Sequence, residues 1–218
     1  MRHRFSAYGI AVSAIAILSI ALVMLGCGSN SSSPKALTQA QAQSIATAVS
    51  NGMGQAVTGA FGVASLKPGA NTVHNLEASP NVSTPVCVPS PSGEVCNWPI
   101  ASTYTCPGGG SMALSGSITG ILNTGGTGSA QAQIAATPAS CSVDGIVLNG
   151  NPQVNLAAQI NIMGDNPVWP LTGTETGGVT YGPNPSGSCT LNLTFTVNSS
   201  VACTVSGTAC GHSVSGSC

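Results

Sequence analysis

The chain carries very little charge. Only 4% of its 218 residues are Asp, Glu, Lys or Arg, compared with about 25% in an ordinary soluble domain. It contains four basic residues in total, whereas a protein that neutralises a nucleic-acid backbone needs clusters of Lys and Arg. Nucleic-acid binding is therefore excluded, and an enzyme that depends on several ionisable groups is disfavoured.

Aromatic side chains are also scarce, at 4%, although the chain is not short of apolar residues, which make up 42%. Disordered chains usually combine low hydrophobicity with high net charge, and here the formal net charge is −1. The 28 glycines and 14 prolines indicate many turns. We therefore expect a folded chain with many turns and small side chains.

The N-terminus has the layout of a secretory signal. Arg2 and Arg4 precede an apolar run from about Ile10 to Met24. This run is about 15 residues long, and a membrane-spanning helix needs roughly 20. A removed signal is therefore favoured over a permanent transmembrane anchor.

The end of this run, Met24-Leu25-Gly26-Cys27, resembles the lipobox of bacterial lipoproteins. It departs from the usual pattern at Met24, where Leu is commonest, and at Leu25, where a small residue is commonest. The alternative is ordinary secretion with cleavage after Gly28, because Gly26 and Gly28 also form a small-x-small cleavage site.

The resemblance implies cleavage before Cys27 and attachment of palmitate and other acyl chains to that cysteine. Residues 1–26 would then be the signal peptide, and residues 27–36 the lipidated cysteine with a flexible Ser-rich tether. It further implies a bacterial envelope protein anchored by the lipid on Cys27. We expect the outer membrane, on its periplasmic or surface face.

The cysteine count supports export in either case. Of nine cysteines, all but Cys27 form an even set that suits four disulfides, which persist in oxidising compartments. No pair has the spacing of a zinc site, so we predict neither a metal nor a cofactor. The eight cysteines are Cys87, Cys96, Cys106, Cys141, Cys189, Cys203, Cys210 and Cys218.

A helix is predicted over residues 38–62, at the start of a single domain spanning residues 37–218. Thr38 and Gln41 form a capping box, and apolar residues recur every four positions from Ile45 to Phe61. The segment has no charge, whereas helices that lie on membranes are usually rich in Lys and Arg. Burial against a sheet is therefore favoured over a position on the membrane.

Residues 111–218 alternate between apolar and polar positions, which predicts an antiparallel meander. The expected fold is mainly β (α+β), with the N-terminal helix packed on a disulfide-stapled open sheet or partial barrel of about seven strands. Residues 67–105 are expected to be irregular and cross-linked. Asn149-Gly150 predicts a hairpin turn.

The spacing of the last strands restricts the disulfides. A three-residue loop at 198–200 would set Phe195 opposite Cys203 and Cys189 opposite Ala209. Cys189 would then be about 20 Å along the strand from the position facing Cys203, too far for a disulfide, whereas Cys210 would be within reach. Similar folding brings Cys106 near Cys141, and the segment from Cys87 to Cys96 could close on itself.

No known catalytic motif is present, so an enzyme is the less favoured interpretation. We expect a structural or binding role, with a glycan, lipid or protein as the partner. Trp98 and Trp169 are candidate ligand-binding residues, although each could instead plug one end of the sheet. The alternatives are a carrier of a lipid or small apolar ligand, and a hydrolase acting on a neutral glycan through two of Asp144, Asp165 and Glu175.

Overall fold

The structure is a computed structural model that describes residues 36–61, 85–150, 153–163, 166–200 and 202–218. These residues belong to one compact unit, Pro34–Cys218. The predictions for the signal peptide, for Cys27 and for all but the last residue of the tether lie outside the described residues. So do residues 67–84 of the segment expected to be irregular.

The predicted helix is present as α2 (Gln39–Ala60). Thr38 is its N-cap and forms the predicted capping box with Gln41, which satisfies two amide groups that the helix leaves free. Gly52 permits a close approach to the sheet, because a Cβ there would lie 3.3 Å from Met112 Cε. Gly52 thus lets α2 pack tightly against Met112 and Tyr104 of the sheet.

Within the residues that the structure describes, the sheet is antiparallel throughout and contains twelve strands rather than about seven. Nine of them follow one another in the order β1-β2-β3-β4-β7-β9-β10-β11-β12, which does not close on itself. The fold is therefore mainly β, with one helix packed on an open meander sheet, as predicted. The strands are β1 (Val86–Ser90), β2 (Gly93–Thr105), β3 (Ser111–Asn123), β4 (Thr127–Ala139), β5 (Cys141–Val143), β6 (Ile146–Asn149), β7 (Val154–Met163), β8 (Asn166–Pro167), β9 (Leu171–Gly182), β10 (Gly187–Val197), β11 (Cys203–Ala209) and β12 (His212–Ser217).

The expectation of irregular structure over residues 67–105 is wrong from Val86 onward, because β1 and β2 form a hairpin there. Along β2, buried Cys96, Trp98 and Ile100 alternate with exposed residues, which is the period of a strand. Pro99 obscured this pattern. It is tolerated because β1 begins opposite Asn97, so no described strand pairs with Pro99 on the side where it cannot donate a hydrogen bond.

The predicted hairpin at Asn149-Gly150 is also absent, because β6 pairs with β5 and β9 rather than with β7. The tight turn lies earlier, at Asp144-Gly145, between paired Val143 and Ile146. Both turn residues have positive φ, 49° and 75°, as a type I′ turn requires. Asn149 instead accepts a hydrogen bond from the backbone amide of Ser140 through Oδ1.

The predicted register of β10 and β11 is wrong by two residues, although the predicted faces are correct. Phe195 lies opposite Val205, and Val197 opposite Cys203, so the loop runs from residue 198 to residue 202. Asn198 Oδ1 accepts hydrogen bonds from the backbone amides of Ser200 and Ala202. This side chain stabilises a longer loop than the spacing of apolar residues indicated.

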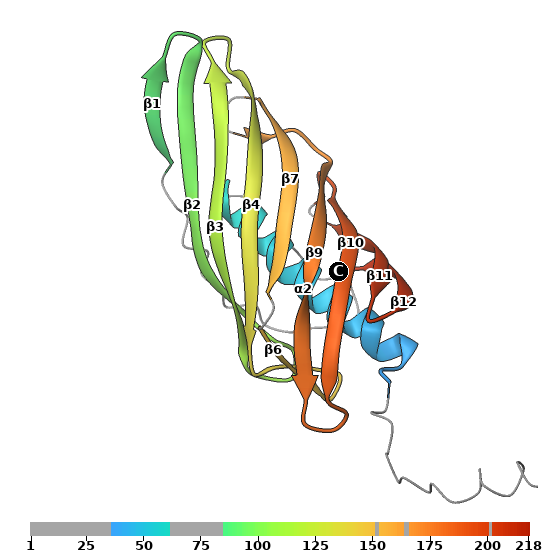
Figure 1. The fold of residues 1–218 in the computed structure, drawn as a ribbon. Coiled ribbons are helices and arrows are strands. Elements are labelled where there is room, and N and C mark those ends of the chain that lie inside the picture. Colours follow the sequence, from blue (N-terminus) through green and yellow to red (C-terminus); the bar gives the residue numbers. More distant parts are fainter. Residues whose placement is uncertain (1–35, 62–84, 151–152, 164–165, 201) are drawn as a thin grey trace, which may run out of the picture. The chain divides into compact units, whose positions relative to one another are not determined.

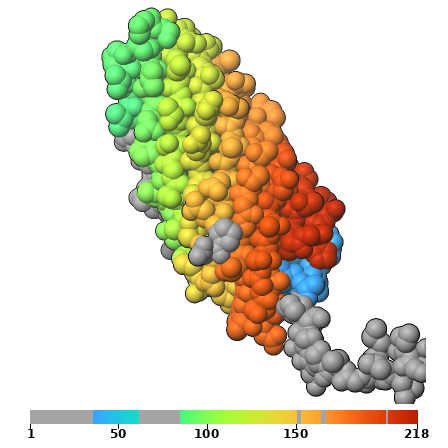
Figure 2. All heavy atoms as spheres, in the orientation of Figure 1, coloured from blue at the N-terminus to red at the C-terminus, as the bar shows by residue number. Residues whose placement is uncertain are grey.

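The core lies between α2 and one face of the sheet, called here the inner face (Figure 1). α2 contacts strands from β2 to β12, so it crosses nearly the whole sheet. Figure 2 shows the opposite face of the sheet, called the outer face, across which the strands follow one another in sequence order. Its side chains are largely Ser, Thr, Asn and Gln, which alternate with the buried residues along β7, β9 and β10.

Candidate functional site

The most unusual group in the core is the carboxyl of Glu175, which is fully buried. Its neighbours across the sheet are Leu156 on β7 and Leu193 on β10, both buried on the inner face. Glu175 therefore points toward α2 rather than toward solvent. There Ser50, itself fully buried, donates a hydrogen bond from Oγ to Glu175 Oε2 at 2.7 Å.

The surroundings of this carboxyl disfavour its charged form. Glu175 Oε1 has no hydrogen-bond partner, and the described residues include no Lys or Arg. Burial raises the pKa of Glu175 to about 7, while the hydrogen bond from Ser50 lowers it. The carboxyl is thus neutral under mildly acidic conditions, because ionisation would place an uncompensated charge in an apolar core.

Of the three predicted acids, the structure describes Asp144 and Glu175, and it does not bring these two together in a cleft. Glu175 is enclosed beneath α2, whereas Asp144 is exposed in the turn between β5 and β6. Asp165 lies outside the described residues. A glycosidase needs two carboxyl groups that flank an accessible bond, and enclosed Glu175 is not placed for that role.

The two tryptophans have different surroundings. Trp98 is only 4% exposed, and its ring centroid lies 5.5 Å from that of Phe61, which follows α2. Its ring is therefore part of the core and presents no face to a ligand. Trp169 is partly buried against the core, so it keeps some accessible surface.

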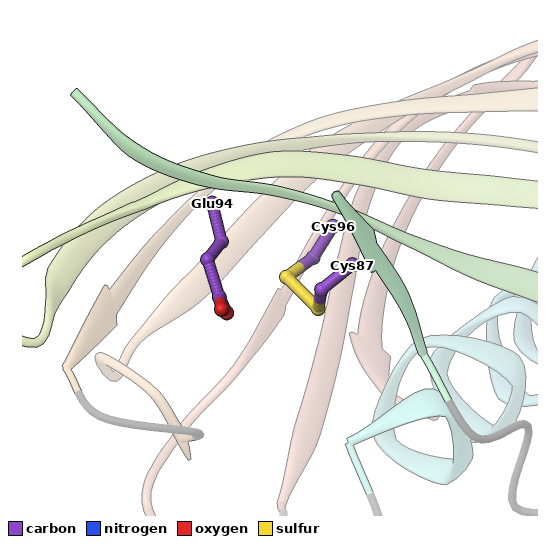
Figure 3. Close-up of side chains that lie close together, drawn as sticks. All are labelled: Cys87, Glu94 and Cys96. Atoms are coloured by element: carbon purple, nitrogen blue, oxygen red, sulfur yellow. A yellow bond between two sulfur atoms is a disulfide. The ribbon is translucent and has the colours of Figure 1, made fainter. Parts of the chain in front are cut away.

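Cys87, Glu94 and Cys96 lie together on the β1–β2 hairpin (Figure 3), with their sulfur and carboxylate atoms within 4.8 Å of one another. Thiolate and carboxylate groups at such distances can hold a zinc ion. Both sulfur atoms are joined in a disulfide, however, so the carboxylate is the one remaining ligand. With the disulfide formed, Cys87 and Cys96 link β1 to β2 and do not form a metal site.

The cysteines form four disulfides: Cys87–Cys96, Cys106–Cys141, Cys189–Cys210 and Cys203–Cys218. Cys189 is not bonded to Cys203, as predicted, and each of the three pairs judged reachable is formed. Cys203–Cys218 is the pair that the sequence had left unassigned. The disulfide of Cys189 forms even though the register differs, because Cys210 N donates to the Thr190 carbonyl at 2.9 Å.

Helix α2 also meets the edge of the sheet at β12. Gln39 Nε2 donates to the Ser213 carbonyl, and Gln43 Oε1 accepts from the Ser215 amide at 2.9 Å. His212 Nε2 lies 2.9 Å from the carbonyl oxygen of Leu37. The two glutamine contacts satisfy backbone groups of β12 on the edge that no described strand pairs.

The sequence did not predict the pairing of Ser50 with Glu175. The inward position of Glu175 could have been predicted, because Leu171, Gly173 and Glu175 alternate with polar residues and share the inner face. The partner was not readable, because Ser50 is 125 residues away in the sequence.

Within the described residues, no helix is both long enough and apolar enough to cross a membrane. Comparisons with protein-family models, with curated proteins and with solved structures found no match to this chain.

Proposed function

We propose that this protein is an exported lipoprotein, anchored in the bacterial envelope through a lipid on Cys27, with a structural or binding role. The observation that carries the proposal is the use of the cysteines. The four disulfides take up eight of the nine, and the ninth is the cysteine of the lipobox-like segment. Disulfides on this scale also fit an oxidising compartment outside the cytoplasm.

A binding role draws support from the outer face. Thr172, Thr174 and Thr176 on β9 are exposed there, next to Asn155 and other polar residues of β7. Hydroxyl and amide groups donate and accept hydrogen bonds without charge. Such a surface suits a neutral polar partner, for example a glycan or an uncharged protein face.

The two alternatives have less support. A carrier would hold its apolar ligand on the inner face, but α2 packs there with Ile45, Val49 and Met53 fully buried. A hydrolase would need an accessible pair of acids, and Glu175 is enclosed. We therefore favour the non-enzymatic role.

Labelling with radioactive palmitate in a bacterial expression host tests the anchor. The wild-type chain should incorporate the label and partition with membranes, and Cys27→Ser should do neither, because serine offers no thiol for the acyl group. Ser32→Ala, a change within the tether, is the matched control and should label normally. Equal labelling of Cys27→Ser and wild type would refute the proposal, provided that mass analysis shows four disulfides in both.

A further inference from the structure

We propose that rising pH loosens the docking of α2: the helix docks most firmly while the carboxyl of Glu175 is protonated, and its released form becomes more populated when that carboxyl ionises. The inference concerns the internal mechanics of the domain and does not depend on the lipid anchor. It starts from the position of Glu175, fully buried between the inner face of the sheet and Ser50 of the helix.

Docked α2 provides no counter-charge for an ionised Glu175. Ser50 supplies one neutral hydrogen bond to Oε2, and Oε1 has no partner. A buried ion without a counter-charge and with one oxygen unsatisfied is strongly unfavourable. Detachment of α2 would let water solvate both oxygens, so ionisation and release are thermodynamically coupled.

The other titratable groups that the structure describes around the helix do not supply a counter-charge to Glu175. The described residues of α2, β7 and β10 include no titratable side chain apart from that of Cys189, which is disulfide-bonded. Tyr104 on β2 packs beside Gly52, and burial raises its pKa, so it stays neutral. Glu94 on β2 is exposed.

Among the described residues, His212 of β12 is the remaining candidate for a counter-charge. It contacts the Leu37 carbonyl at the start of the helix. With a rise of about 1.5 Å per residue, that point lies about 20 Å along α2 from Ser50. An imidazolium there is too distant to compensate a charge on Glu175.

Release should be confined to α2, because covalent links hold the sheet but not the helix. All four disulfides join positions in or beside strands, and the described helical segment contains no cysteine. Gly52, Gly54 and Gly59 each weaken the helix by about 1 kcal/mol relative to Ala. An element held only by packing opens before cross-linked strands do.

The expected pH range follows from linkage. An exposed glutamate titrates near pH 4.5 and the docked one near pH 7. Between these values the released form gains stability as pH rises, about tenfold in population per pH unit. The total change is on the order of a hundredfold, and the effect levels off above pH 7.

Hydrogen–deuterium exchange of the purified full-length protein from pH 4 to pH 8.5, corrected for intrinsic exchange rates, tests the inference. Protection of α2 amides in the wild type should fall about a hundredfold across this range, while β7 and β10 keep their protection. Glu175→Gln and Glu175→Leu should abolish the pH dependence of α2, because neither side chain ionises. Glu94→Gln, which removes an exposed carboxylate, should leave it intact.

Three results would overturn the inference. The first is α2 protection in the wild type that does not change with pH, and the second is the same pH dependence in Glu175→Gln. The third is loss of protection in β7 and β10 in parallel with α2, which would mean global unfolding. If Glu175→Gln folds poorly, Glu175→Leu supplies the same comparison with an apolar side chain in the core.

Discussion

Gly173 on β9 lies directly opposite Phe195 on β10, the largest of the fully buried side chains. A Cβ at Gly173 would lie 2.4 Å from Phe195 Cε1 and 2.9 Å from the Cβ of Ala158. The missing side chain thus makes room for the aromatic ring. The glycine acts here through space, since its φ lies outside the left-handed region.

Gly173→Ala should therefore destabilise the protein by about 1–3 kcal/mol, as overpacking of a filled core does. Chemical denaturation monitored by tryptophan fluorescence measures the change. Gly125→Ala is the matched control, because a Cβ there meets nothing within 4 Å, and it should change stability by less than about 0.5 kcal/mol. Equal effects of the two substitutions would contradict this account of Gly173.

The elements at the two ends of the sheet are protected in different ways. The edge of β12 is covered by the glutamines of α2. No described strand pairs with β1 on the side away from β2, and β1 carries Pro89, which has no amide hydrogen to offer to another chain. Both devices hinder edge-to-edge association, which matters because Val86 and Val88 are 63% and 59% exposed.

Pro89→Thr restores an amide on the free edge of β1 and should promote self-association. Sedimentation velocity over a range of concentrations should detect oligomers of the variant at concentrations where the wild type stays monomeric. Pro91→Thr, in the turn between β1 and β2, adds no amide to the edge strand and should behave as the wild type does. Identical sedimentation of all three proteins would show that Pro89 does not protect this edge.

At the level of elements, the sequence predicted strands wherever apolar and polar residues alternated without interruption. β3, β4, β7 and β10 were found in this way. β2 was missed because Pro99 broke the pattern, and the turn at Asp144-Gly145 was passed over for Asn149-Gly150. Both dipeptides favour a tight turn. The hairpin forms at Asp144-Gly145 because the strands that flank it, β5 and β6, pair with each other.

In the molecule as a whole, the four disulfides reduce the entropy of the unfolded chain by different amounts. Cys106–Cys141 closes a separation of 35 residues and Cys87–Cys96 one of nine. Longer closed loops remove more entropy from the unfolded chain. The logarithmic dependence on loop length gives an advantage of about 1 kcal/mol to the longer one.

Removal of Cys106–Cys141 by double substitution to serine should therefore lower the free energy of unfolding about 1 kcal/mol more than removal of Cys87–Cys96. The two double variants serve as controls for each other, since each replaces two cysteines. Denaturant titrations of both, compared with the wild type, measure the difference. A larger loss for the Cys87–Cys96 variant would mean that strand-edge packing outweighs loop entropy.

The sequence by itself determined the properties that depend on local order and on counting. In β3, β4, β7 and β10, alternating side chains specified which face is buried. A capping box placed the start of α2, and cysteine parity predicted four disulfides. The tertiary structure decided which distant residues meet. It paired Cys203 with Cys218, set the register of β10 and β11, and enclosed Glu175 with Ser50. Such contacts depend on how a helix crosses a twelve-stranded sheet, a geometry set by packing of the whole core rather than by any local pattern.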